Sequence, residues 1–156
     1  MTDRELIRHS IAVLAYRAGK PLRGAPANFG SYETGPGGNT PLVILTHLGD
    51  LMDWALSHLK GEPRWVGAQA RSWDEQVARF YASLAALDAY LAGEQPIRCE
   101  LKRLLAGPIA DAINHVGQLM MLRRMSGSPV YGENYFVADI ETGRVGPEQS
   151  PPVKPF

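Results

Sequence analysis

Residues 40–60, TPLVILTHLGDLMDWALSHLK, hold the clearest structural signal of the chain and decide its fold class. Thr40 is a good N-cap, and Pro41 suits the first helical position because its missing N–H would be unpaired there in any case. One face then carries residues at helical spacing: Ile44, His47, Leu51 and Trp54. The stretch predicts a helix over 41–60 that Gly61 and Pro63 end.

Three further regions repeat this helical pattern between glycines and prolines. Capping-box spacings at Thr2 and Ser72, each three residues before a glutamate, predict helices over 3–18 and 73–92. The fourth region is interrupted: PIRCELKRLLAG, residues 96–107, indicates a short helix, and a longer one follows over about 108–126, with Arg123 and Arg124 exposed. Strand signals are too few for a sheet, so we predict an all-α four-helix bundle.

The rest of the chain is irregular and belongs to the same single domain, residues 1–156, with the bundle over about 1–126. Residues 19–40 hold much of the glycine and proline and form a long loop after the first helix, either functional or a plain crossover between non-adjacent helices. Residues 127–156 form an irregular C-terminal tail. Within it, YFVADI (135–140) is either a short strand or an extended segment across the bundle.

Composition excludes several classes of function. Lysine plus arginine total 16, and aspartate plus glutamate also total 16, so the net charge is zero. The chain therefore lacks the excess of positive charge that is typical of nucleic-acid-binding proteins. One cysteine, Cys99, excludes an internal disulfide, which fits a cytoplasmic protein. The charged start MTDRELIRHS lacks the apolar core of a signal peptide, and no run of 18 apolar residues suggests a membrane span.

Three polar residues fall on faces where leucines are expected. Asp111 and His115 are four residues apart and so lie one turn apart on one face, together with Leu119 and Leu122. His47 lies on the apolar face of helix 41–60. A divalent metal removes the cost of burying these groups, since it binds neutral imidazole and ionised carboxylate directly. Two histidines and a carboxylate from facing helices make a metal site with open positions.

A simpler interpretation stays open beside this one. Asp111 is three residues after Pro108, which is expected near the start of the helix. A carboxylate in this first turn would interact favourably with the helix dipole and need not bind a metal. An inward histidine is often only a hydrogen-bonded core residue. His58, three turns after His47, is too far along the helix to share a metal with it and is better interpreted as a C-terminal cap.

The segment HVGQLMMLRR, residues 115–124, resembles the last-helix signature of the DinB/YfiT-like superfamily, in which histidine, a variable residue and Gly-Gln-Leu precede Leu-Arg. The segment PLVILTHLGDLMDW, residues 41–54, resembles the helix that carries this family's first histidine. The likeness implies a four-helix bundle with a divalent metal, often zinc or nickel, held by three histidines. Relatives include thiol-dependent S-transferases, an isomerase and metal-dependent hydrolases, and dimers are common among them.

Carried onto this chain, the resemblance places the first metal ligand at His47 and the last at His115. The middle ligand falls on Asp111, where the family usually has histidine. Aspartate is a competent ligand, and its added charge would favour a harder metal or a different affinity, so zinc or nickel is expected first and iron or manganese is also admitted. The same departure would also mark a relative that has lost its metal.

The predicted function is that of a metal-dependent hydrolase or thiol S-transferase acting on a small molecule, with a homodimer as a further expectation. Asp50, one turn after His47, is a weak catalytic candidate as a proton acceptor, and is equally a solvated carboxylate. Asn114 and Gln118 are candidates to line the pocket, or polar contacts between helices. The alternative is a metal-free bundle that acts as a binding or interaction protein. The chain has no nucleophile elbow and no phosphate loop.

Overall fold

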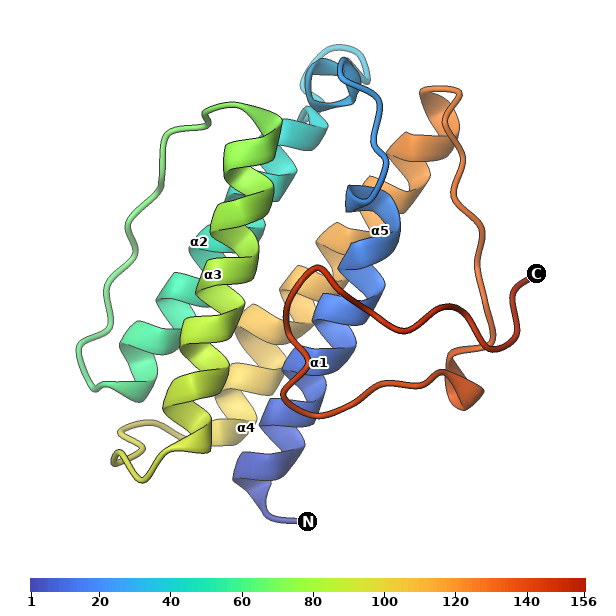
Figure 1. Ribbon diagram of the computed structural model, residues 1–156. Coiled ribbons are helices and arrows are strands. Elements are labelled where there is room, and N and C mark those ends of the chain that lie inside the picture. The colour runs from blue at the N-terminus through green and yellow to red at the C-terminus, as the bar shows by residue number, and fades with distance from the viewer.

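The computed structural model describes residues 1–156 and shows four helical rods packed side by side, with no β-sheet (Figure 1). The rods are α1 (Asp3–Leu22), α2 (Pro41–Leu59), α3 (Trp73–Ala92) and a composite fourth rod. In the fourth rod, α4 (Leu101–Leu104), the π-helical turn η2 (Leu105–Ile109) and α5 (Ala110–Met125) follow one another without a break. The predicted all-α four-helix bundle is confirmed.

The four rods form a square in which α1 and α2 occupy opposite corners. Helix α1 packs mainly against α3 and α5, and α2 packs against the same two helices. The predicted long loop therefore connects non-adjacent helices, as a crossover does, and it includes the short turn η1 (Phe29–Ser31). This arrangement makes α2 and α5 neighbours, which brings the two segments with candidate metal ligands side by side.

The N-terminal ends of the helices follow from their caps. Thr2 and Ser72 each accept a hydrogen bond from the backbone N–H three residues on, and Glu5 and Glu75 bond back to the cap residues. At the start of α2, the side chain of Thr40 accepts from the N–H of Val43. These bonds satisfy N–H groups that a helix leaves free, so the predicted starts at residues 3, 41 and 73 are confirmed.

Helix α1 continues to Leu22 instead of ending near residue 18, because a distant arginine caps it. Arg123 is 4 % exposed, and its guanidinium donates to the carbonyl oxygens of Pro21 at 2.7 Å and of Arg23 and Gly24 at 3.3 Å. Burial lowers the pKa of Arg123. The expectation that Arg123 is exposed is therefore wrong: it satisfies carbonyls at the end of α1.

The predicted interruption in the fourth rod is a π-helical turn, η2. Pro108 lacks the N–H that would bond to the carbonyl of Leu104, and its ring would collide with that carbonyl in a regular α-helix. The turn η2 relieves this conflict, and the N–H of Ala110 reaches back to the carbonyl of Leu105. The backbone of Leu104, Ile109 and Ala110 stays in the right-handed helical region throughout.

The core lies between the rods, and the C-terminal tail covers the outer side of α1 (Figure 1). Each rod contributes fully buried side chains, among them Leu14, Leu48, Leu84 and Leu119. In the tail, residues 135–140 hold the turn η3 (Tyr135–Val137) and no strand, so the strand alternative is wrong. Tyr135 packs edge-on against Tyr16.

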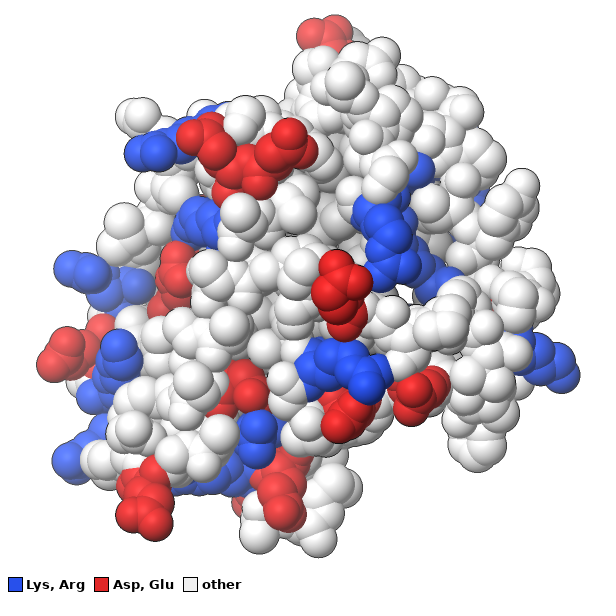
Figure 2. Space-filling model, in the orientation of Figure 1, with Lys and Arg blue, Asp and Glu red and all other residues white.

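The surface carries both signs of charge. On the face shown in Figure 2, lysines and arginines alternate with aspartates and glutamates, with no broad field of one sign. None of the helices combines the length and the apolar character needed to cross a bilayer.

Candidate metal centre

Two neighbouring helices bring His47, Asp111 and His115 together. Each side chain offers one ligand atom, and these atoms all lie within 4.8 Å of one another. Nε2 of His47 is 3.3 Å from Oδ2 of Asp111, and Nδ1 of His115 is 3.3 Å from Oδ1 of the same carboxylate. The two imidazole rings are 4.7 Å apart, centre to centre. The three residues selected from sequence therefore form one cluster, which could hold a metal ion.

The spacing of the cluster suits a small divalent ion. Two ligand atoms held tetrahedrally at about 2.1 Å from zinc lie about 3.4 Å from each other. The 3.3 Å between His47 Nε2 and Asp111 Oδ2 is close to this separation. No lysine or arginine pairs with Asp111, whose only ion-pair partners are the two histidines. The donor set fits the group that the resemblance implies.

A hydrogen bond within α5 fixes the tautomer of His115. Its Nδ1 lies 2.8 Å from the backbone carbonyl oxygen of Asp111, and a carbonyl can only accept. Nδ1 therefore carries a proton, and in the neutral ring the lone pair is on Nε2. Metal-binding histidines are commonly oriented in this way, by donating the other ring N–H to a carbonyl or carboxylate.

The cluster is accessible from solvent. The exposed side-chain fractions are 34 % for His47, 44 % for Asp111 and 19 % for His115. This partial exposure corrects the expectation that the three groups replace core leucines. It lowers the cost of placing a carboxylate there and leaves space for water or another molecule beside an ion.

Asp111 lies in the first turn of α5, as predicted, but that turn is not a free helix start. The fourth rod begins at Leu101, ten residues earlier, and is helical through η2 into α5. Asp111 therefore faces no free helix N-terminus, and the dipole interaction expected in a first turn is not available to it. Its carboxylate turns to the two histidines instead.

Two tryptophans form an aromatic wall beside His47. The indole ring of Trp65 is 5.5 Å from the imidazole of His47 and 5.7 Å from the ring of Trp54. Trp54 in turn contacts His58, with ring centres 4.9 Å apart. Trp65 lies in the extended segment between α2 and α3, which has no helical periodicity. Sequence reasoning missed Trp65 for that reason, and its only signal was a large aromatic residue in a polar loop.

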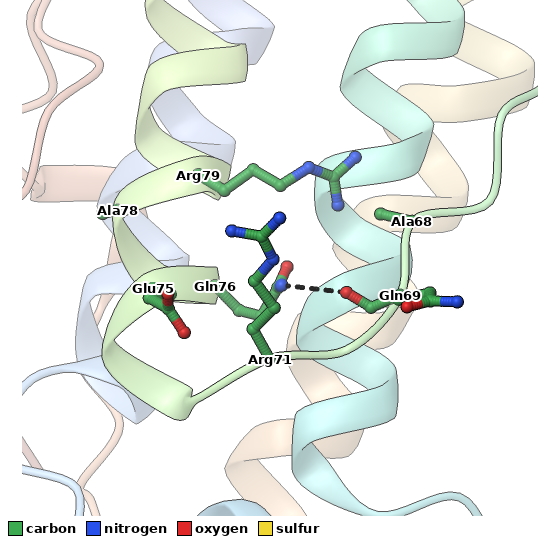
Figure 3. A pocket seen from close by; sticks show the side chains of 7 residues that line it. All are labelled: Ala68, Gln69, Arg71, Glu75, Gln76, Ala78 and Arg79. Atoms are coloured by element: carbon green, nitrogen blue, oxygen red, sulfur yellow. Dashed lines mark hydrogen bonds between the residues drawn. The ribbon is translucent and has the colours of Figure 1, made fainter.

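Asp50 lies on another side of α2, toward α3. Its Oδ1 is 2.6 Å from Nη2 of Arg79 and accepts from the N–H of Ala68 at 3.2 Å. These contacts account for its burial without a metal, and its catalytic role stays a prediction. Arg79 also lines a cavity of about 680 Å³ between α3 and the segment before it (Figure 3). No residue of the metal cluster lines that cavity.

The other two pocket candidates point outward. Asn114 and Gln118 are exposed on α5, and neither lines one of the larger cavities. Their proposed contact with a bound molecule stays a prediction. His58 sits in the last turn of α2, well away from the cluster, as its spacing from His47 predicts.

Comparison with protein-family models, with curated proteins and with solved structures found no match for this chain.

Proposed function

We propose that the chain is a divalent-metal protein of the DinB/YfiT-like kind, and that it acts as a metal-dependent hydrolase or thiol S-transferase on a small molecule. The observation that carries the proposal is the convergence of His47, Asp111 and His115 at the face between α2 and α5. The likeness of HVGQL, residues 115–119, to a metal-binding last helix supports it independently.

Each of the three residues would have its own role in such a metal centre. His47 and His115 would supply neutral nitrogens, and Asp111 would supply one negative charge. The carbonyl of Asp111 holds the His115 ring in place through the Nδ1–H bond. The bound ion would act as a Lewis acid, lowering the pKa of a water or thiol that it coordinates.

The donor set admits several divalent metals. Two imidazoles suit zinc and nickel, and the carboxylate in place of a third imidazole also admits iron and manganese. The partly exposed side of the cluster leaves room for a small substrate, including a thiol. Trp65 and Trp54 offer an apolar surface at that side.

Metal analysis of protein purified without a histidine tag tests the proposal. We expect about one ion per chain in the wild type and a small residue in His47→Ala, because a three-ligand site loses most of its affinity with one ligand. His58→Ala is the matched control, since this histidine lies on the same helix outside the cluster. Equal metal in wild type and His47→Ala would contradict the proposal and favour a metal-free binding protein.

The reaction class needs a second measurement on the metal-loaded protein. Hydrolysis of a chromogenic ester without added thiol would indicate a hydrolase, and turnover of an electrophile only with added thiol would indicate an S-transferase. Either activity should disappear in His47→Ala and persist in His9→Ala, a change at a histidine of α1 outside the cluster. Turnover that survives His47→Ala would show that the activity does not come from this centre.

A further inference from the structure

A second cavity lies beside the metal cluster, between the end of α2 and the start of the fourth rod. Its volume is about 450 Å³, within the range of small-molecule sites. Its walls include residues of both rods and of the connection between α3 and α4: Trp54, His58, Cys99, Arg103, Leu104 and Pro108. None of the three metal-binding candidates lines this cavity, so it is a separate space.

The cavity and the metal cluster lie on the same two rods, α2 and the fourth rod. Trp54 is seven residues after His47, which places it two turns along the same face of α2, about 10 Å away. On the fourth rod, Gly107 and Pro108 line the cavity one turn before Asp111, about 5 Å along the axis. A molecule that fills the cavity therefore has one end close to the cluster.

Trp65 connects the two spaces. Its ring contacts His47 on one side and Trp54 on the other, and Trp54 contacts His58 farther along. An unbroken aromatic wall thus runs from a metal-binding candidate into the cavity. Leu104 and Pro108, both buried, supply apolar surface on the fourth rod. Aromatic and aliphatic surfaces on two rods suit a flat apolar group.

The wall of the cavity carries one carboxylate and one guanidinium, Glu100 and Arg103. The Nε of Arg103 lies 3.3 Å from Oε2 of Glu100, and Lys102, which does not line the cavity, contacts the same oxygen at 3.3 Å. The pairing with Glu100 uses Nε of Arg103, so its two terminal amino groups stay free for a second carboxylate. A guanidinium binds a carboxylate through two parallel hydrogen bonds, which makes Arg103 the natural partner for an anionic end.

We propose that this cavity binds the body of the substrate of the metal centre, and that the substrate is a small organic acid with a planar, apolar body. The body packs against Trp54 and Leu104, the carboxylate pairs with Arg103, and the opposite end reaches the metal cluster past Pro108. That the bound molecule is a substrate rests on the proposed function, whereas its binding depends only on the residues of the cavity.

Cys99 provides a direct reporter of occupancy. It is the only cysteine of the chain, and it lines the cavity. The probe is 3-phenylpropionate, with its neutral amide as the uncharged counterpart. We expect the acid to slow alkylation of Cys99 by iodoacetamide at a concentration about fivefold lower than the amide requires, as a partly exposed ion pair allows. No protection by either compound at millimolar concentration would overturn the inference.

Two pairs of variants locate the binding. Arg103→Gln should remove the preference for acid over amide, whereas Lys102→Gln should keep it, although both lose one charge beside Glu100. Gly107→Leu should abolish calorimetric binding of the acid, because a Cβ at Gly107 meets open space in the cavity. Gly117→Leu is its control, an exposed helical glycine with equally open surroundings. Equal effects within either pair would overturn the assigned site.

Failure of this inference is distinguishable from failure of the proposed function. Binding of 3-phenylpropionate should be unchanged in His47→Ala, because Arg103 and not the metal holds the carboxylate. Loss of binding in His47→Ala but not in Arg103→Gln would overturn the assigned orientation. Metal in the wild type without protection of Cys99 overturns the cavity assignment alone. Protection without metal overturns the proposed function, and with it the role of the cavity as a substrate site.

Discussion

Replacing Asp111 with asparagine tests the candidate metal ligand that differs from the three histidines of the resembled family. The change keeps the shape and one oxygen of the side chain but removes the charge that lies between the two imidazoles, 3.3 Å from each. Losing a group that only orients a ligand weakens metal binding 10- to 100-fold. We therefore expect loss of a charged ligand to raise the Kd for zinc by about 100-fold.

This change in affinity has a calculable effect on thermal stability. Metal at 100 times the wild-type Kd stabilises the folded chain by about 2.7 kcal/mol. For a chain of this size that raises the Tm by about 5–11 °C. At the same zinc concentration Asp111→Asn is half saturated and gains about 0.4 kcal/mol, which raises its Tm by about 1–2 °C.

The assay is thermal unfolding followed by circular dichroism, with chelator and with zinc. Asp74→Asn is the matched control, because Asp74 is an exposed aspartate in the first turn of α3 with no metal-binding neighbour. It should lose no more than about 1 kcal/mol from the helix dipole and keep the full response to zinc. A full zinc response in Asp111→Asn would refute the assignment of Asp111 as a ligand.

Three further predictions concern groups outside the cluster. Arg123→Met should lower the free energy of unfolding by about 3 kcal/mol in urea, because it leaves carbonyls at the end of α1 unpaired, whereas exposed Arg124→Met should change it by less than about 0.5 kcal/mol. Hydrogen bonds from the side chain and backbone of Ser72 lower the pKa of Glu75, so its contribution to stability is present above pH 4.5 and is lost as the pH falls further. In Glu75→Gln, the free energy of unfolding should therefore fall less steeply between pH 5 and pH 3. The difference in slope from the wild type should correspond to the uptake of at most about one proton, measured by unfolding at a series of acid pH values. Burial raises the pKa of Cys99, so its alkylation rate should rise at higher pH than that of a free cysteine peptide, and a coincident profile would contradict this.

Local signals predicted most of the fold because they act within one turn. The caps at Thr2, Thr40 and Ser72 bond to groups three residues away, so their positions follow from the sequence. The end of α1 depends on Arg123, about a hundred residues away, and no local pattern carries such a contact. Helix starts were therefore predictable here, whereas one helix end was not.

The candidate site was predictable only in part, for a related reason. The spacing of Asp111 and His115 fixes their common face, and periodicity fixes the face of His47. That the two faces meet depends on α2 and α5 being neighbours in the bundle, which the crossover after α1 decides. The position of Trp65 depends on the path of the extended segment between α2 and α3. That path could not be predicted, because an extended segment without sequence periodicity gives no indication of which way its side chains face.

The π-helical turn explains why the triad is half exposed instead of buried. In a regular α-helix, residues three or four apart lie on the same face. A regular helix that buries Leu104 would therefore also bury positions 108, 111 and 115. The turn η2 adds one residue and rotates all that follows by about 100°. The buried stripe of α5 accordingly runs through Ile109, Ala112, Val116 and Leu119. Asp111 and His115 move to the edge of that stripe, where they face His47 and still meet solvent. Pro108 enforces the turn, so one proline places both residues where a carboxylate is tolerated and a small molecule can reach it.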